Sequence, residues 1–298
     1  MTRLTFVIAM LGCMAPAFAQ STASPSLSPV TWERLVNAAD EPENWLMYSG
    51  TLDSQRFSRL DQVHNRNVGE LELKWAYQIP QLDRSESVPV VVDGVMFITE
   101  APSNVVAVDA ATGRQYWRYD HPLPDDLRIC CGRNNRGVAI LGETLYMSTL
   151  DAHLVAIDAR TGNVIWDKEV ADHRSGYSKT AAPLIVKDEV VTGIAGGEYG
   201  IRGFIDSYNA VTGDLEWRAN TIPGPDHHAD LQRSRRVTLP STLVINRVRH
   251  PHRRTNARTS SSRRSRRTAR VLGRIHGSFT QPYVAVVPRR HERHLRDA

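Results

Sequence analysis

The chain has 298 residues, and its hydrophobic content of 41% is sufficient for a globular core. No stretch after residue 19 approaches the roughly 18 apolar residues that a transmembrane helix needs, which excludes a protein anchored by such a helix. The net charge of +5 hides an asymmetry, because residues 1–230 carry 19 Lys and Arg against 30 Asp and Glu (−11), whereas residues 231–298 carry 18 against 2 (+16).

The first nineteen residues have the organisation of a secretory signal peptide. Arg3 gives a basic start, an apolar run follows from Leu4 to Pro16, and Ala17-Phe18-Ala19 is a small-x-small end. We therefore expect cleavage before Gln20 and a mature protein in the periplasm. Lipidation of Cys13 is disfavoured because the apolar run before it is short for a lipoprotein signal.

A repeat of about fifty residues organises the following part of the chain. Each copy contains an alternating strand, a Thr-Gly pair and a Trp: Val106–Asp109 with Thr112-Gly113 and Trp117, Val155–Asp158 with Thr161-Gly162 and Trp166, and Ser207–Asn209 with Thr212-Gly213 and Trp217. The glycines lie 49 and 51 residues apart, as do the tryptophans. Gly69 and Trp75 mark a degenerate earlier copy.

Each copy predicts a β-hairpin, because glycine accepts the positive φ of a tight turn between two strands. Further strand candidates at Val88–Phe97, Val138–Ser148 and Leu184–Ile194 bring each period to about four strands, the content of one propeller blade. The fold class is therefore predicted to be an all-β β-propeller, with a sandwich or β-solenoid as the alternative. The tryptophans are expected in the core between blades.

Cys130 and Cys131 are the two cysteines that remain after removal of the signal peptide. Neighbouring α-carbons lie about 3.8 Å apart, whereas disulfides usually need about 4.4–6.8 Å, so a bridge between them is strained. Such strain gathers at functional sites. The residues alone leave three alternatives open: a strained bridge, two unlinked buried cysteines, or a metal-binding pair.

Four segments, in this order, resemble the methanol and ethanol dehydrogenases that depend on pyrroloquinoline quinone (PQQ). They are Arg84–Pro89, Ile129–Gly137, Ser178–Pro183 and Gly193–Gly203. Members of that family are eight-bladed propellers, and this chain represents about four blades, so the propeller is incomplete. A non-catalytic propeller scaffold of the cell envelope is the alternative, but it needs none of these four segments.

The resemblance implies a cofactor site built from residues far apart in the sequence. A bridge between Cys130 and Cys131 would lie against one face of PQQ, and Arg136 would bind the carboxylates and carbonyls of the quinone. Glu86 stands where the family places an acidic residue near PQQ. Thr180 matches the threonine whose hydroxyl meets the cofactor.

The resemblance implies that the glycine-rich segment, Gly193–Gly203, contributes backbone amides and a metal ligand. Ala195, Gly196 and Gly197 match the family's amide-presenting stretch, although many relatives have Ser in place of Ala195. Glu198 would be the ligand of Ca²⁺, a hard cation that prefers oxygen donors; a lanthanide is the alternative ion.

The implied activity is oxidation of a primary alcohol to an aldehyde in the periplasm. In the family, Ca²⁺ polarises a quinone carbonyl, an Asp takes the alcohol proton and hydride passes to the ring. A c-type cytochrome is the expected electron acceptor.

Three parts of the chain are distinguished: a signal peptide at 1–19, a partial propeller at 20–226 and an Arg-rich tail at 227–298. The resemblance runs from Trp32 to Pro225. The segments that supply an Asn calcium ligand, the aromatic floor under PQQ and the catalytic Asp are not found, so the catalytic residue is unknown and we expect a poorly soluble, inactive product.

The tail from residue 231 onward contains 18 Arg but no Lys and no Trp. We interpret residues 227–298 as disordered or as the product of a shifted reading frame in a G+C-rich gene, because out-of-frame codons there favour Arg, Ser, Pro and His. A basic arm that binds nucleic acid is the alternative, but such arms mix Lys with Arg and an exported propeller does not meet nucleic acid. No nucleic-acid partner is expected.

Overall fold

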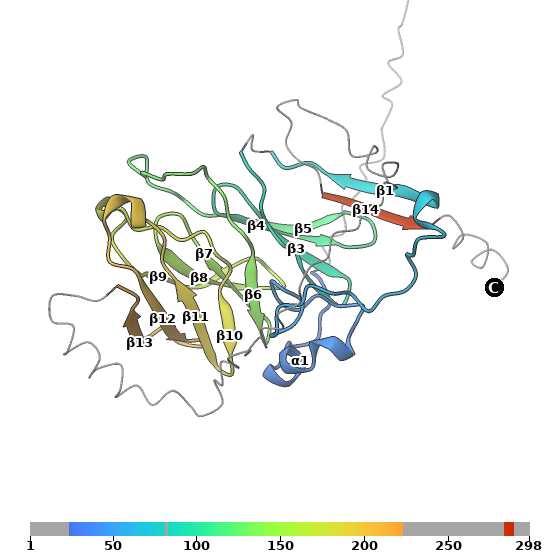
Figure 1. Ribbon diagram of the computed structural model, residues 1–298, viewed down its shortest axis with the longest axis horizontal. Helices are drawn as coiled ribbons and strands as arrows, with labels where there is room; N and C mark the ends of the chain where they lie inside the picture. The colour runs from blue at the N-terminus through green and yellow to red at the C-terminus, as the bar shows by residue number, and fades with distance from the viewer. Residues whose placement is uncertain (1–23, 81–82, 223–282, 289–298) are drawn as a thin grey trace, which may run out of the picture.

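The structure is a computed structural model that describes residues 24–80 and 83–222, together with the backbone of one strand at 283–288 (Figure 1). The predicted signal peptide and, apart from that strand, the predicted tail lie outside the described residues.

Three four-stranded antiparallel sheets form the body of the described chain. Each sheet contains four strands consecutive in the sequence, paired in order as a meander: β2 (Val90–Val92), β3 (Val95–Glu100), β4 (Asn104–Asp109) and β5 (Gln115–Asp120); β6 (Val138–Leu141), β7 (Thr144–Ser148), β8 (His153–Asp158) and β9 (Val164–Glu169); β10 (Leu184–Val186), β11 (Glu189–Gly193), β12 (Phe204–Asn209) and β13 (Leu215–Asn220). The prediction of four strands for each period is confirmed.

The Thr-Gly pairs form the tight turns between the third and fourth strand of each sheet. In the first turn, the Asp109 carboxylate accepts hydrogen bonds from the backbone amides of Ala111 and Thr112, and Gly113 takes a φ of +72°. A side chain that caps its own turn and a glycine at positive φ are the local reasons for the reversal. Asp158 and Asn209 cap the other two turns in the same way.

The strand candidates between these hairpins each divide into two strands. Val88–Phe97 is interrupted after β2 by Asp93-Gly94, both at positive φ, which is the geometry of a two-residue hairpin turn. The other two candidates are also interrupted by two-residue turns, at 142–143 and 187–188, in which the first residue alone, Gly142 or Lys187, has positive φ.

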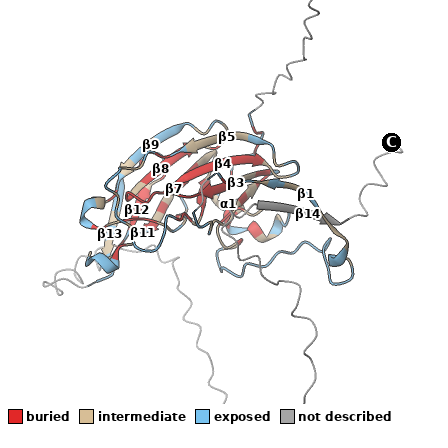
Figure 2. Cartoon of the chain, turned by 90° about the horizontal axis from the view of Figure 1, so that it is seen from above, coloured by how far each residue is buried: buried red, intermediate tan, exposed pale blue. Residues whose placement is uncertain are grey.

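The three sheets follow one another along an open arc, as blades of a propeller do (Figure 2). The inner strands β2, β6 and β10 contact each other in sequence order, and the middle strands of the first two sheets are the most deeply buried. The outer strands β9 and β13 are largely exposed. The predicted propeller architecture is confirmed, and the described sheets do not close into a ring.

A fourth pairing lies at one end of the arc. Strand β1 (Leu71–Tyr77), which carries Trp75, pairs antiparallel with β14 (Tyr283–Pro288) beside the first sheet (Figure 1). The short helical elements are α1 (Trp32–Val36), η1 (Ala38–Asp40), η2 (Val68–Glu70), η3 (His173–Ser175) and η4 (Gly197–Tyr199). In the described part of the chain, no helix has the length and apolarity to cross a membrane.

Candidate functional site

The loop between β5 and β6 carries the cysteine pair and Arg136. Cys130 and Cys131 are joined by a disulfide bond, which decides among the three alternatives left open by the sequence. Both cysteines are exposed, so the bond presents a surface rather than filling a core.

Backbone hydrogen bonds attach Arg136 to the loops that open the neighbouring blades. The Arg136 carbonyl accepts from the amide of Val88 at 3.0 Å, and the Arg136 amide donates to the carbonyl of Thr180 at 3.0 Å. The chain segments before β2, β6 and β10 are therefore held side by side at the inner rim of the arc.

The side chains of three predicted site residues meet at this rim. Arg136 Nη2 lies 2.7 Å from Glu86 Oε2, and Arg136 Nη1 donates to Thr180 Oγ1 at 2.6 Å. The side chains of Arg136 and Glu86 are 37% and 36% exposed, so the guanidinium is held in place but remains accessible to a ligand. The arrangement can present a planar cation and a hydroxyl to an anionic or carbonyl-bearing molecule.

The glycine-rich segment approaches the same region through backbone pairing. Ala195 and Ser178 exchange two backbone hydrogen bonds, of 2.7 Å and 3.0 Å. The amide of Ala195 is therefore occupied, which leaves the amides of Gly196 and Gly197 as the candidates for contact with a ligand.

Gly196 is required by the local geometry. Its φ is +118°, and a Cβ at this position would lie 2.0 Å from the carbonyl oxygen of Gly176. A residue with a side chain cannot adopt this conformation without moving the adjacent loop. The element η4, which contains Glu198, begins at the next residue.

Glu198 and the disulfide form the second cluster of predicted residues. A carboxylate oxygen of Glu198 and the two sulfur atoms of Cys130 and Cys131 all lie within 4.8 Å of one another. A disulfide has no thiolate to donate, so Glu198 is the one hard oxygen ligand of this cluster. Glu86, the cysteine pair, Arg136 and Thr180 lie in the segments that precede the first strands of the three sheets, and residues 195–198 lie in the connection between β11 and β12.

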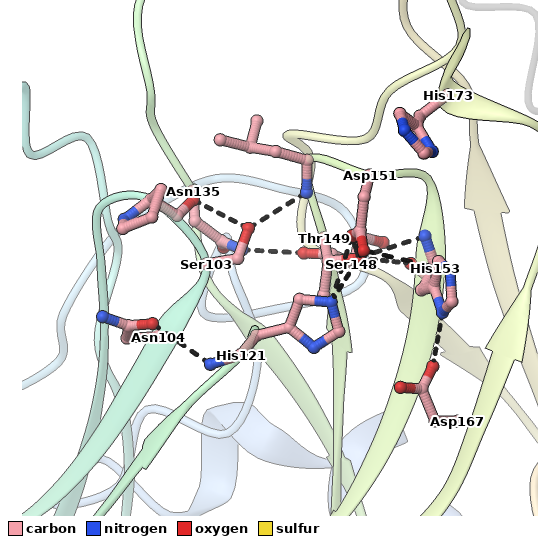
Figure 3. A network of polar contacts seen from close by, with 12 residues as sticks. Ser103, Asn104, His121, Asn135, Ser148, Thr149, Asp151, His153, Asp167 and His173 are labelled. Atoms are coloured by element: carbon pink, nitrogen blue, oxygen red, sulfur yellow. Dashed lines mark hydrogen bonds and ion pairs between the residues drawn. The ribbon is translucent and has the colours of Figure 1, made fainter. Parts of the chain in front are cut away.

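A polar network near this loop, with His121 and Asp151 buried and Asp167 exposed, was missed from the sequence (Figure 3). His121 Nε2 lies 3.0 Å and 3.1 Å from the two carboxylate oxygens of Asp151, and His153 Nδ1 lies 2.8 Å from Asp167 Oδ1. Burial raises the pKa of Asp151, but hydrogen bonds from His121 and Thr149 outweigh it, so the pKa lies below the usual value. The carboxylate is held ionised beside two imidazoles.

Asn135 connects the strands next to this network with the loop that carries Arg136. Its side-chain amide donates to the carbonyl of Ser148 at 2.7 Å, its side-chain oxygen accepts from the amide of Gly137 at 3.1 Å, and its own carbonyl accepts from Thr99 Oγ1. Asn135 is buried and directly precedes Arg136. These bonds fix the backbone from which the Arg136 side chain projects.

The sequence matches one protein family over residues 45–242, that of the PQQ "Glucose/ethanol/alcohol dehydrogenase, beta-propeller domain". Among curated proteins, the chain is 43% identical over 197 residues to the quinoprotein alcohol dehydrogenase PedH of Pseudomonas putida, covering 65% of this chain and 33% of PedH. It is 44% identical over 196 residues to the quinohemoprotein alcohol dehydrogenase ADH-IIG of Pseudomonas putida, covering 64% and 27%. The chain thus spans between about a quarter and a third of the length of these relatives.

Solved structures give the same result at the level of the fold. The quinohemoprotein alcohol dehydrogenase ADHIIG from Pseudomonas putida HK5 has a TM-score of 0.63 and 41% identity, covering 67% of this chain and 30% of that protein. A europium-containing methanol dehydrogenase has a TM-score of 0.60 and 34% identity, covering 65% and 34%.

Proposed function

The chain belongs to the family of PQQ-dependent alcohol dehydrogenases with a β-propeller fold, and from this membership we propose that it provides part of the quinone pocket of an enzyme that oxidises primary alcohols to aldehydes. Its expected place is the periplasm. The membership also favours this enzyme over the non-catalytic scaffold that the repeat alone allowed.

One observation carries the proposal. The guanidinium of Arg136 contacts both Glu86 and Thr180 at the inner rim of the blades. These three residues come from three loops, about fifty residues apart at each step of the repeat. An individual blade needs neither the ion pair with Glu86 nor the hydrogen bond to Thr180 in order to fold, because Glu86, Arg136 and Thr180 all lie outside the strands of the sheets. A set of partly exposed, mutually oriented polar groups from three loops is the usual construction of a ligand site.

The groups present fit the quinone. PQQ is planar and bears carboxylates and adjacent carbonyls, which suit the forked donors of Arg136 and the hydroxyl of Thr180. The glycine pair at 196 and 197 allows close approach of backbone amides, and the Cys130–Cys131 disulfide offers an apolar surface for one face of a ring. When bound, PQQ supplies the hydride acceptor for alcohol oxidation.

Glu198 is the residue of this chain that would hold the metal ion. Its carboxylate is exposed and lies beside the cysteine pair, where it can bind Ca²⁺ or a lanthanide together with ligands from outside the described residues. The europium-containing methanol dehydrogenase among the similar structures supports a trivalent ion as the alternative to calcium.

The electron acceptor is proposed to be a c-type cytochrome. The names of several relatives describe quinohemoproteins, which combine a quinone with haem in one protein. This chain shares the quinone-bearing region with them, so its electrons would leave by the same route.

Equilibrium dialysis of the full chain against PQQ, with Ca²⁺ or with EDTA, tests the proposal. We expect saturable binding that EDTA weakens, because Glu198 and Arg136 act on the same ligand. We expect no alcohol-dependent dye reduction by this chain, because the catalytic Asp that the resemblance implies is not identified in it. Absence of metal-dependent PQQ binding by a folded sample would contradict the assignment of the pocket.

A further inference from the structure

Lys179 stands between the two residues that attach this part of the candidate site to its neighbours. Ser178 exchanges two backbone hydrogen bonds with Ala195. Thr180 accepts hydrogen bonds from both the amide and the guanidinium of Arg136, at 3.0 Å and 2.6 Å. The backbone on either side of Lys179 is therefore fixed by the site, and its side chain starts one residue from the hydroxyl that the proposed quinone would meet.

The side chain of Lys179 lies in the protein interior. The residue is 1% exposed, and its amine is buried with no hydrogen-bond partner in the described part of the chain. Lysine is almost never fully buried without a partner, because an unpaired ammonium loses its hydration and gains nothing in return. A charged group held in this way beside a ligand site is a candidate for a role in that site.

The charged groups that act on the Lys179 amine lie at the joint between the second and third sheets. They are the carboxylate of Asp206 on β12 and the guanidinium of Arg218 on β13. Asp206 is 0% exposed and already accepts two hydrogen bonds from Arg218, at 2.6 Å and 2.7 Å, and one from the hydroxyl of Tyr208 at 2.7 Å. Arg218 also donates to the carbonyl of Val170, which follows β9. Among the described residues, one occupied carboxylate therefore faces two cations whenever Lys179 is protonated.

Burial and this surplus of positive charge make the amine titrate close to neutral pH. Burial lowers the pKa of Lys179 to about 7, a change that Asp206 opposes and Arg218 assists. A lysine in water keeps its proton up to about pH 10.4. A positive charge therefore appears or disappears in the protein interior near neutral pH, one residue from Thr180.

We propose that Lys179 couples ligand binding at Arg136 and Thr180 to the uptake of a proton from solvent, so that an anionic quinone binds more tightly when this amine is protonated. The inference rests on the proposed quinone pocket and identifies a residue that acts on the bound anion without touching it. The carboxylates of PQQ are ionised above about pH 5, as carboxylic acids are. Their attraction to a buried ammonium is weakly screened, because a buried charge interacts through protein rather than through water.

The direction of the pH dependence follows from the two protonation states of the amine. A bound anion raises the pKa of Lys179 above its value of about 7 in the free protein. Between these two pKa values the complex holds more protons than the free protein, so the affinity falls as the pH rises. The expected fall is about fivefold to tenfold, the order for one unit charge acting over about 12–15 Å at an effective dielectric constant of about 20.

Isothermal titration calorimetry of the full chain with PQQ in the presence of Ca²⁺ is the first test. Titrations between pH 6 and pH 9, each in two buffers with different heats of ionisation, give the affinity and the number of protons taken up. We expect net uptake of a fraction of a proton between about pH 7 and pH 8, and an affinity about fivefold to tenfold lower at pH 9 than at pH 6. This measurement needs no variant.

Lys179→Met removes the ammonium and keeps most of the side-chain volume. We expect the proton uptake to vanish and the affinity at pH 6 to fall to that of the parent chain at pH 9. Lys187→Met makes the same change at an exposed position and should behave as the parent does. His121, His153 and His173 are present in all three chains, so any protons that they bind cancel in the comparison. Thermal unfolding checks that each variant is folded.

Two results would overturn the inference and leave the quinone pocket in place. One is PQQ binding by the parent chain with equal affinity at pH 6 and pH 9 and without proton uptake. The other is a proton uptake that persists unchanged in the Lys179→Met variant, which would assign the proton to another group. A folded parent chain that binds no PQQ at any pH would instead contradict the proposed function, and the inference with it.

Discussion

The Arg136 guanidinium donates to the hydroxyl of Thr180 at 2.6 Å, although the two residues are separated by 44 positions and lie in the loops that open different blades. The contact exists because the backbone amide of Arg136 also donates to the Thr180 carbonyl, so backbone and side chain are fixed together. Glu86 holds the other side of the guanidinium. A cation fixed from two sides is preorganised for a planar anion, since little side-chain entropy is left to lose on binding.

Arg136→Lys is expected to lower the affinity for PQQ by about tenfold or more, because an ammonium cannot make two parallel hydrogen bonds to one carboxylate. Its fold should be unchanged, since the side chain is 37% exposed. Dialysis with PQQ measures the affinity, and circular dichroism checks the fold. Arg133→Lys is the control, an exposed arginine of the same loop. Equal losses of PQQ affinity for both variants would mean that net charge, rather than the two parallel N–H donors of the Arg136 guanidinium, attracts the quinone.

Gly196→Ala is expected to destabilise the protein by about 2–4 kcal/mol, because it adds a Cβ that meets the Gly176 carbonyl oxygen at a residue with φ of +118°. Thermal and denaturant unfolding measure the change. Gly197→Ala is the matched control, since nothing lies within 4 Å of its added Cβ and its φ is not positive. If the two variants unfold alike, the loop at Gly196 relaxes at little cost.

The blades could be predicted from the sequence because their determinants are local and repeated. A Thr-Gly turn and a tryptophan four residues after its glycine recur at nearly constant spacing, and each copy folds into the same hairpin. The site could not be predicted this way. Glu86, Arg136 and Thr180 are ordinary loop residues one at a time, and only their likeness to a known family indicated that they act together.

The missed features depend on contacts that no spacing reveals. His121 and Asp151 belong to different blades, so their pairing requires the packed structure. The contact between His153 and Asp167 could have been predicted from the sequence. The register of the hairpin makes the two residues diagonal neighbours across β8 and β9. The burial of Lys179, which is 1% exposed, gave no signal either, since a lysine between Ser and Thr in a loop is ordinarily exposed.

The pairing of His153 with Asp167 is expected to stabilise the protein at low pH. The hydrogen bond that His153 donates to the Asp167 carboxylate raises the pKa of His153 above its usual value near 6.5, against an opposing effect of burial. The stabilisation is therefore complete below the unfolded pKa and is lost as the pH rises through the folded pKa. Asp167→Asn should lower the free energy of unfolding more at pH 5.5 than at pH 8.5, measured by urea titration at both pH values. An equal loss at the two values would show that the imidazole charge is not involved.

Lys179 is expected to make the protein less stable at neutral pH than in alkali. The residue is 1% exposed, and its amine is buried without a hydrogen-bond partner. Burial lowers the pKa of Lys179 to about 7, a change that nearby Arg218 assists and Asp206 opposes. Between about pH 7 and 10.5 the unfolded chain binds more protons than the folded one, so stability should rise with pH by up to about 1.4 kcal/mol per unit. Lys179→Met should remove this rise and stabilise the protein most at pH 7 and below. Lys187→Met makes the same chemical change at an exposed position and should leave the slope intact. A parent chain whose urea midpoint does not increase between pH 7 and 10 would show that Lys179 keeps its proton when folded, because a partner or solvent reaches the amine.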